Sequence, residues 1–487
     1  MHLVLLAFLT SFVITSPGWT AQYVDVNWSG TESGTTTAPF SSIRAGVGAA
    51  SSGETIIIAD GTYSDSVENF SAAGHINIPS GLTLEAGYVG HTGGSTFDWT
   101  TRTPRTTTID LASAGNNRAF FSDSQATPTL DGFTFQNANN SLDGGAVWLG
   151  DSFSQGGVVR NSLFQNNVTT GSGGAIRFEG NNDQSILENV DFLNNQAAHG
   201  GALEISVPGD QNVQFTDVLF DANTATGTGG AIRVLGGAKV NVSSAQFTGN
   251  SANDGGAINN SRGTVVLKQT SIVGNTAAGE SAINAWGFQD VNVLLENVLI
   301  ANNISTGGGY AVEVGSNRDG ELTANFVTVA DNAGAGAIYV HEKGSAQDEV
   351  LNLTNSIIDG TGTGTGINTD IGSAGVLNLN YNDVYDFGTL YGGTATAGGN
   401  SLSTDPQFYD AATNSYQLAP TSPLLGAADP SSTLGFDLIG DSRPLGDGYT
   451  MGAFEASLPE PGMMIFLMTC VLTLYCRRPR QGSRTNS

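Results

Sequence analysis

Cysteine is nearly missing from this chain of 487 residues, since Cys470 and Cys476 are its two cysteines and both lie close to the C-terminus. Disulfide bonds and thiolate metal sites are therefore excluded from the rest of the chain. Lysine is also nearly absent, and charged residues make up only 13% of the sequence. Because 44 acidic residues face 17 basic ones, the formal net charge is −27. This charge argues against nucleic acid and anionic lipid as partners.

The signatures of several enzyme classes are missing as well. The sequence has no phosphate-binding loop, no catalytic-serine elbow and no dinucleotide-binding fingerprint, and nowhere are two aspartates adjacent. Glycoside hydrolysis needs two carboxylates that face each other across a groove. The histidines are scattered without metal-ligand spacing. We therefore expect no cofactor and no dedicated metal site, although an acidic surface can hold adventitious Ca²⁺.

Glycine is abundant, with 66 residues, and it marks an internal repeat of about 27 residues. Five copies of Gly-Gly-Ala followed by an aliphatic residue begin at Gly144, Gly173, Gly200, Gly229 and Gly255. Three degenerate copies follow, at Ser281-Ala282-Ile283, Tyr310-Ala311-Val312 and Gly336-Ala337-Ile338. A fixed period of this length indicates one structural unit stacked on itself.

Each repeat has the pattern of short strands. Apolar and polar residues alternate after the alanine, as in Ile176-Arg177-Phe178, which is typical of a half-buried strand. A second motif, Phe-x-x-Asn, precedes most of the alanines, first at 164–167 and later with aliphatic residues in place of Phe. The sequence therefore predicts an all-β, right-handed parallel β-helix with coils about 4.8 Å apart. Equivalent residues would form columns, including an asparagine ladder at a turn where Asn tolerates left-handed backbone.

Both ends of the chain have features of targeting signals. An apolar run over residues 3–14 precedes a small residue, Ala21, which predicts a secretory signal with cleavage near Ala21; a core strand at the N-terminus is the alternative. The C-terminal end combines Pro459-Glu460-Pro461, an uncharged stretch over residues 462–475 and a basic cluster with Arg477 and Arg478. The uncharged stretch is short for a relaxed membrane span, and the arginines would remain cytoplasmic.

Residues 41–50 suit a short helix between two strands, and residues 87–105 suit a loop. A cap is needed here because the first coil would otherwise expose its core and its edge. We divide the chain into a signal peptide (1–21), a cap with the first irregular coils (22–130), regular β-helix repeats (131–380), a C-terminal capping module (381–456) and a sorting signal or membrane tail (457–487).

Any catalytic residues are expected among the polar residues two positions after each alanine. Arg177, Glu204 and Arg233 would lie on consecutive coils, where we favour an exposed ion-pair ladder that fixes coil register over a catalytic arginine. Trp148 and Tyr339 would lie on the same face and could stack on sugar rings, although isolated exposed aromatic residues are common.

These motifs support four family resemblances. Gly-Gly-Ala-Ile paired with Phe-x-x-Asn resembles the polymorphic outer membrane protein repeats of bacterial surface β-helix proteins, over roughly residues 130–340. The N-terminal order of strand, helix and strand resembles pectate-lyase-like β-helix proteins. Asp405-Pro406, Arg443-Pro444 and Met451-Gly452-Ala453-Phe454-Glu455 are similar to the choice-of-anchor Q module. The C-terminal end resembles a PEP-CTERM sorting signal, which implies an exosortase-type processing enzyme as a partner; a plain tail anchor is the alternative.

Together these features predict an exported, non-catalytic β-helix protein of the cell surface, outer membrane or extracellular matrix, with a tail that is transiently in the inner membrane. We expect it to be adhesin-like or glycan-associated, with a surface or matrix polysaccharide or another cell-surface component as its partner. The alternative is a polysaccharide lyase or glycoside hydrolase with a shallow groove on the side of the β-helix.

Overall fold

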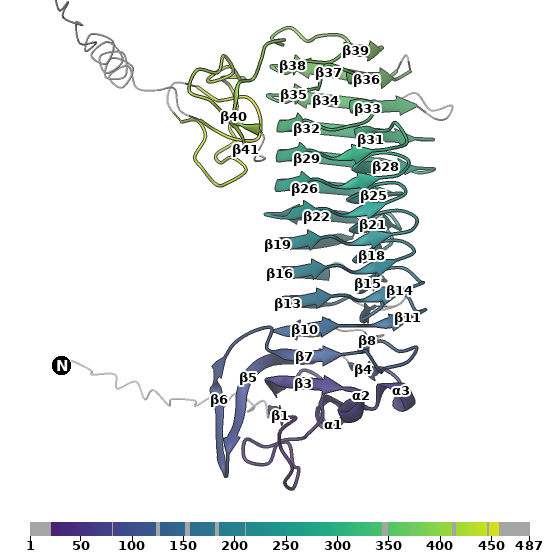
Figure 1. Cartoon of the computed structure of the whole chain (residues 1–487), viewed down its shortest axis with the longest axis vertical. Coiled ribbons are helices and arrows are strands. Elements are labelled where there is room, and N and C mark those ends of the chain that lie inside the picture. Colours follow the sequence, from purple (N-terminus) through teal and green to yellow (C-terminus); the bar gives the residue numbers. More distant parts are fainter. Residues whose placement is uncertain are drawn as a thin grey trace, which may run out of the picture.

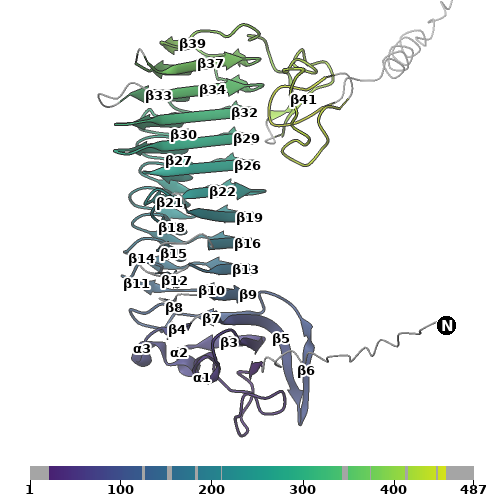
Figure 2. The same cartoon turned by 180° about the vertical axis from the view of Figure 1, so that it is seen from behind.

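The computed structural model describes residues 21–456, except for 80, 123–126, 151–155, 181–184, 210, 343–348, 373, 412–414 and 446–447. Over these residues the chain is a parallel β-helix whose coils are stacked in one long column (Figures 1 and 2). The fold class predicted from the repeat is confirmed. Within the described residues, no helix has the length and apolar character that a membrane span requires.

Three sheets run along the column. A 12-stranded sheet takes one strand from each coil: β4 (Ile76–Asn77), β8 (Phe120–Ser122), β12 (Val147–Leu149), β15 (Ile176–Glu179), β18 (Leu203–Ser206), β21 (Ile232–Leu235), β25 (Ile258–Asn260), β28 (Ile283–Gly287), β31 (Tyr310–Ser316), β33 (Gly336–Glu342), β36 (Thr365–Asp370) and β39 (Thr389–Gly393). A 7-stranded sheet of two-residue strands comprises β11 (Asn139–Asn140), β14 (Val168–Thr169), β17 (Gln196–Ala197), β20 (Thr224–Ala225), β24 (Ser251–Ala252), β27 (Thr276–Ala277) and β30 (Ile304–Ser305).

The third sheet has 20 strands and forms the longest face. Its N-terminal part contains β1 (Gln22–Val24), β2 (Thr55–Ala59), β3 (Gly61–Ser64), β5 (Thr83–Gly93), β6 (Thr96–Arg102), β7 (Thr107–Asp110), β9 (Thr129–Asp131), β10 (Phe133–Gln136), β13 (Val158–Gln165), β16 (Ser185–Leu193) and β19 (Asn212–Asp221). It continues through β22 (Lys239–Ser243), β23 (Gln246–Thr248), β26 (Gly263–Val273), β29 (Val291–Ala301), β32 (Gly320–Ala330), β34 (Val350–Thr354), β35 (Ile357–Asp359), β37 (Val376–Asn380) and β38 (Asp383–Tyr385).

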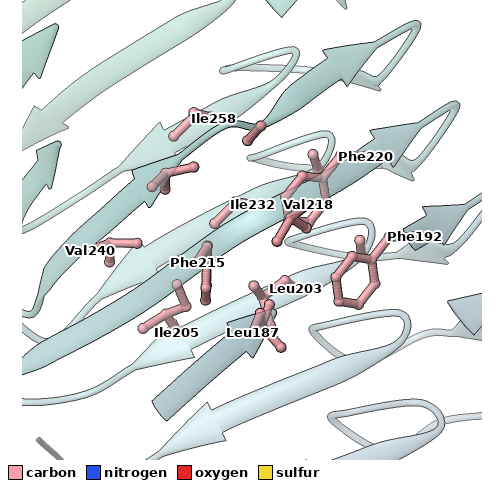
Figure 3. Close-up of a cluster of buried hydrophobic side chains, with 14 of the residues drawn as sticks. Leu187, Phe192, Leu203, Ile205, Phe215, Val218, Phe220, Ile232, Val240 and Ile258 are labelled. Atoms are coloured by element: carbon pink, nitrogen blue, oxygen red, sulfur yellow. The ribbon is translucent and has the colours of Figure 1, made fainter. Parts of the chain in front are cut away.

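The core is a set of apolar columns parallel to the axis. In the 12-stranded sheet, Ile176 pairs with Leu203 and Leu203 pairs with Ile232, as the repeat predicts. On the opposite side Phe164, Phe192, Phe220 and Phe247 are stacked, with neighbouring ring centroids 4.7 to 5.3 Å apart. These rings are fully buried, and Figure 3 shows Phe192 and Phe220 beside Leu203 and Ile232. Each coil therefore buries its apolar face against the next coil.

The asparagine ladder exists and is buried. The side-chain Nδ2 of Asn195 donates to Oδ1 of Asn223 (3.0 Å), and Asn223 donates likewise to Asn250 (3.0 Å). The same amide also donates to the carbonyl of the preceding coil's aromatic residue, as from Asn223 to Phe192 (2.9 Å). One detail of the prediction was wrong: the left-handed residue is the one before the ladder asparagine, for example Asn194 (φ 54°). The ladder amide can therefore point inward while its neighbour makes the turn.

The two glycines of each repeat have different roles. Gly200 has φ 56°, a left-handed conformation that glycine adopts without steric cost. A Cβ on Gly201 would collide with the carbonyl of Gly230 on the next coil, although the Gly201 backbone itself is not left-handed. The first glycine therefore makes the turn, and the second lets adjacent coils approach each other.

The N-terminal end is capped by the expected short helix, α1 (Ile43–Ala49), whose N-cap Ser42 accepts a hydrogen bond from the Ala45 N–H (3.2 Å). Two further turns of helix were not expected, α2 (Asp65–Glu68) and α3 (Phe70–Ala73). The loop expected over residues 87–105 was wrong in part, because β5 and β6 pair there as an antiparallel hairpin. This hairpin projects from the side of the first coils (Figure 1).

The C-terminal module lies beside the coils. It begins after β39 rather than at residue 381, because β38 and β39 pair with β35 and β36 of the coils. The chain then forms the small hairpin of β40 (Phe408–Asp410) and β41 (Ser415–Leu418), and the rest of the module, to residue 456, is irregular. We expected it to cap the end of the β-helix, but its contacts are lateral (Figures 1 and 2). It covers outward apolar side chains of three successive coils, namely Leu299, Phe326 and Ile357. The need to bury these side chains accounts for the lateral position.

Two of the motifs that made this module distinctive in the sequence, Arg443-Pro444 and the segment ending at Glu455, meet in a cluster that we call the clamp. Arg443 donates to Glu455 Oε2 (3.1 Å) and to the carbonyl of Gly452 (2.7 Å), and its guanidinium lies over the Phe326 ring of the coils. Asp437 accepts a hydrogen bond from the Glu455 N–H (2.8 Å). These charged groups are buried and paired, so the motif holds the module closed upon the solenoid.

Carboxyl groups collect where the module joins the last coils. Burial raises the pKa of Asp359 to about 7, and the charges of Asp331, Asp386, Asp383 and Asp405 add to the rise. Burial likewise raises the pKa of Asp383 to about 7, although its Oδ1 accepts a hydrogen bond from the Thr404 N–H (2.9 Å). Both groups bind a proton more tightly in the folded chain than in the unfolded one, where the pKa of Asp is about 3.9. Their contribution to stability is therefore full below about pH 4 and is lost as the pH rises through about 7.

We predict that Asp383→Asn raises the free energy of unfolding at both pH 5 and pH 8, by at least about 1 kcal/mol more at pH 8. The amide keeps an acceptor for the Thr404 N–H but removes a buried charge. Denaturant unfolding at both pH values measures the effect, and Asp319→Asn, at an exposed carboxyl group, is the control. An equal change at pH 5 and pH 8 would contradict the assignment.

Candidate functional site

The outward side chains of the 12-stranded sheet form one column along its face. Strand pairing places the following residues in register: Phe121, Trp148, Arg177, Glu204, Arg233, Asn259, Asn284, Glu313, Tyr339 and Asn368. We call this column the polar column. All five candidate residues from the sequence belong to it, as the repeat spacing predicted.

The centre of the polar column is a charged ladder. Arg177 Nη1 lies 2.9 Å from Glu204 Oε1, and Arg233 Nη1 lies 3.3 Å from Glu204 Oε2. Arg177 also contacts Asp143 and, through Nε, Glu179 Oε2 at 3.0 Å. Arg177 is thus bound by three carboxylates from three coils, which fixes its position.

The expected exposure of this ladder was wrong. The Glu204 side chain is only 2% exposed, because the arginines above and below it cover the carboxylate. Burial raises the pKa of Glu204, and the charges of Arg177 and Arg233 offset only part of that rise. The ladder is thus a buried ion-pair network rather than a solvated one.

Trp148 is enclosed by cations rather than free to stack on a ligand. The guanidinium carbons of Arg118 and Arg177 lie 4.7 and 5.4 Å from its ring centroid, and Phe121 contacts its edge. Arg118 is itself buried, and burial lowers its pKa to about 10. This arrangement resembles a packed cation–π cluster, which stabilises the face of the sheet.

Tyr339 lies in a separate cluster on β33. Its ring stacks on His341 (4.2 Å between centroids) and contacts Tyr310 (4.9 Å), and His341 Nε2 lies 2.9 Å from Glu313 Oε1. Burial raises the pKa of Tyr339, and the nearby Asp370 adds to the rise. Six strands separate β33 from β12, so about 34 Å lies between Tyr339 and Trp148. The two aromatic candidates therefore cannot form one sugar-binding site.

A groove of about 300 Å³ adjoins the charged ladder on the same face. Arg233, Asn259 and Asn284 of the polar column line it, and the side chains of Trp286 and Phe288 form an aromatic rim. Phe288 is 67% exposed, and its ring centroid lies 5.4 Å from that of Trp286. We call this depression the ladder groove.

Hydrogen bonds orient the polar lining of the ladder groove. Asn259 Nδ2 donates to Asn284 Oδ1 (3.2 Å), and Asn284 Nδ2 donates to Glu280 Oε2 (3.1 Å). Each amide nitrogen carries a second N–H donor, and Arg233 engages Glu204 through one of its three nitrogens. Asp254 supplies a further carboxylate. The groove thus combines oriented donors, oriented acceptors and aromatic carbon, which suits a ligand with both hydroxyl groups and apolar faces.

Sequence reasoning placed Arg233 correctly but missed the rest of this groove. Glu280 occupies the position of the first glycine in the repeat, and Trp286 follows in the same degenerate copy. The replacement of the repeat glycine by Glu280 is the feature of the sequence that could have identified the groove. Phe288, in the segment between two strands, carried no such signal.

A larger depression of about 480 Å³ lies in the seam between the C-terminal module and the coils. Leu299, Leu438, Ile439 and Phe454 line it together with the neutral amides of Gln246 and Gln269. Its walls are the docking surfaces of the module, so we attribute it to imperfect packing between two parts of the chain.

Several predicted features lie outside the described residues. These are the sorting residues Pro459, Glu460, Pro461, Arg477 and Arg478, and nearly all of the signal segment; Ala21 is the first described residue. Among the described residues, no three His, Cys, Asp or Glu side chains are grouped as metal ligands.

Comparison with known proteins supports the repeat. Residues 161–179 and 217–234 match the Chlamydia polymorphic membrane protein repeat, and both segments contain Phe-x-x-Asn followed by Gly-Gly-Ala-Ile. No curated protein matches the chain. A crystal structure of pectate lyase Pel9A is similar with a TM-score of 0.41 and 16% identity, covering 90% of this chain and 96% of that one. A likeness at this level says nothing about chemistry or substrate.

We predict that Glu204→Ala lowers the free energy of unfolding by about 2–4 kcal/mol, because it leaves two half-buried arginines facing each other without their shared carboxylate. The matched control is Glu188→Ala, which removes a cross-coil pair with Arg160 whose side chains are 53% and 43% exposed. Its cost should remain below about 1 kcal/mol. Denaturant unfolding measures both, and equal losses would refute the assignment of a buried network.

Proposed function

We propose that this chain is an exported, surface-exposed β-helix protein that binds glycans without cleaving them. The ladder groove carries the proposal, since its exposed aromatic rim and oriented amides suit the apolar faces and the hydroxyl groups of a sugar. The polymorphic membrane protein repeats support a place at the cell surface. Adhesion through a surface or matrix polysaccharide is the role that we infer.

The state of the charged ladder favours binding over catalysis. A catalytic base must be able to release and accept a proton at the reacting carbon. Arg177 is instead surrounded by Asp143, Glu179 and Glu204, and Trp148 contacts its guanidinium. These contacts use the arginine to join three coils. The alternative, a lyase or hydrolase with its groove on the side of the β-helix, makes a different prediction for the same assays.

We also propose that the C-terminal end is a sorting signal. The triplet Pro459-Glu460-Pro461, the uncharged stretch and the arginine cluster together resemble a PEP-CTERM signal. The C-terminal module before them resembles the choice-of-anchor Q module. In this proposal the uncharged stretch lies in the inner membrane, and Arg477 and Arg478 keep the end of the chain on the cytoplasmic side. An exosortase-type enzyme then processes the tail near the triplet, on the outer side. The β-helix is then delivered to the cell surface, the outer membrane or the extracellular matrix.

We predict that the full-length chain binds glycans on an array and releases neither reducing sugars nor unsaturated products from them. Arg177→Ala should leave both results unchanged, because the ladder stabilises the fold and does no chemistry. Turnover that disappears in the Arg177 variant would support the lyase or hydrolase alternative. Absence of binding to any glycan would refute the binding proposal.

A second experiment tests delivery. Replacing Pro459 and Pro461 by alanine should leave export intact but trap a larger, membrane-associated form, because the processing enzyme no longer recognises its site. Cell fractionation and immunoblotting distinguish the two forms. If the variant matures and localises as the parent does, a plain tail anchor is the better account.

A further inference from the structure

The charge that lines the ladder groove is negative on balance. Among its described lining residues Arg233 is the one cation, and Glu204 already engages it at 3.3 Å. Two carboxylates, Asp254 and Glu280, face the same space. The local charge therefore has the same sign as the net charge of the chain, which is −27.

These carboxylates are held in place. Asp254 Oδ1 accepts the backbone N–H of Glu280 (3.2 Å), and Asp254 Oδ2 accepts from Asn253 Nδ2 (2.9 Å). Glu280 Oε2 accepts from Asn284 Nδ2 (3.1 Å). These hydrogen bonds hold both carboxylates at the groove. A carboxylate or sulfate entering here would meet like charges in a partly desolvated space, which is unfavourable.

The same carboxylates are good acceptors for hydroxyl groups. A sugar hydroxyl donates to a carboxylate oxygen while it accepts from a neighbouring amide or guanidinium N–H. The rim residues Trp286 and Phe288 offer carbon surface to the faces of a sugar ring. Both kinds of contact are available to an uncharged sugar without the repulsion that an acidic sugar would meet.

We propose that the ladder groove selects neutral glycans and rejects uronate-bearing and sulfated ones. This inference rests on the proposed function and adds the charge class of its ligand. It sets the groove apart from a site for an acidic polysaccharide such as pectate. Recognition depends on the Phe288 ring for affinity and on Asp254 and Glu280 for the exclusion of anions.

The test starts from an array that contains neutral, uronate-bearing and sulfated glycans, probed with the full-length chain. Calorimetric titration then compares the best neutral glycan with tetragalacturonate. We expect binding to neutral glycans, with a loss of about tenfold or more in affinity for Phe288→Ala. Phe436→Ala is the matched control, because Phe436 is a similarly exposed phenylalanine (59%) on the C-terminal module. It should leave the affinity unchanged.

A second variant tests the exclusion of anions. The double substitution Asp254→Asn with Glu280→Gln keeps one acceptor oxygen on each side chain but removes both charges, so it should raise the affinity for tetragalacturonate and reduce its dependence on salt. Binding of acidic glycans only, or an unchanged affinity in Phe288→Ala, would overturn this inference and leave glycan binding itself intact. Binding of no glycan would overturn the proposed function as well.

Discussion

The structure depends on the buried amide ladder that fixes one coil against the next. Each ladder asparagine, such as Asn223, donates to the next asparagine and to a carbonyl of the preceding coil. A coil shifted by one residue would leave several buried polar groups without partners, at a cost of about 1–3 kcal/mol each. It would also turn the apolar side chains outward. Apolar stacking supplies most of the stability, but it is tolerant of small shifts, so the amides determine the register.

Because the register is fixed, each outward residue has fixed neighbours on the coils before and after it. The polar column, and with it the charged ladder, follows directly from the position of each residue within its repeat. A regular repeat produces a uniform face, however, and a uniform face has no particular site. The ladder groove occurs where the repeat degenerates, with Glu280 in place of a glycine and with Trp286 and Phe288 beside it. The regular copies therefore provide stiffness, and the irregular copy provides a place for a ligand.

The sequence predicted the features that repeat and failed at those that do not. The apolar and asparagine columns and the order of Arg177, Glu204 and Arg233 all follow from periodicity, which relates distant residues by simple addition. The cap helix is the exception, because a helix-compatible segment and the exposed end of the first coil predicted it. The burial of Glu204 could not be predicted, because it depends on how long side chains from neighbouring coils fold over it. The hairpin of β5 and β6 and the lateral position of the C-terminal module each involve a segment used once. Such a segment has no second copy elsewhere in the chain from which its structure could be inferred.

The excess of carboxylates over basic groups affects both the stability of the chain and the kind of ligand that we propose for it. An acidic surface keeps an elongated protein soluble and separate from anionic polymers, but it also places carboxylates where the C-terminal module meets the coils, where burial raises the pKa of Asp359 and Asp383 to about 7. Several of the arginines are paired with carboxylates: Arg177 and Arg233 in the ladder, Arg443 in the clamp. In the ladder groove Arg233 is paired in this way, and the carboxylates of Asp254 and Glu280 outnumber it. The selectivity for neutral glycans that we propose is thus connected with the ion pairs that stabilise the coils.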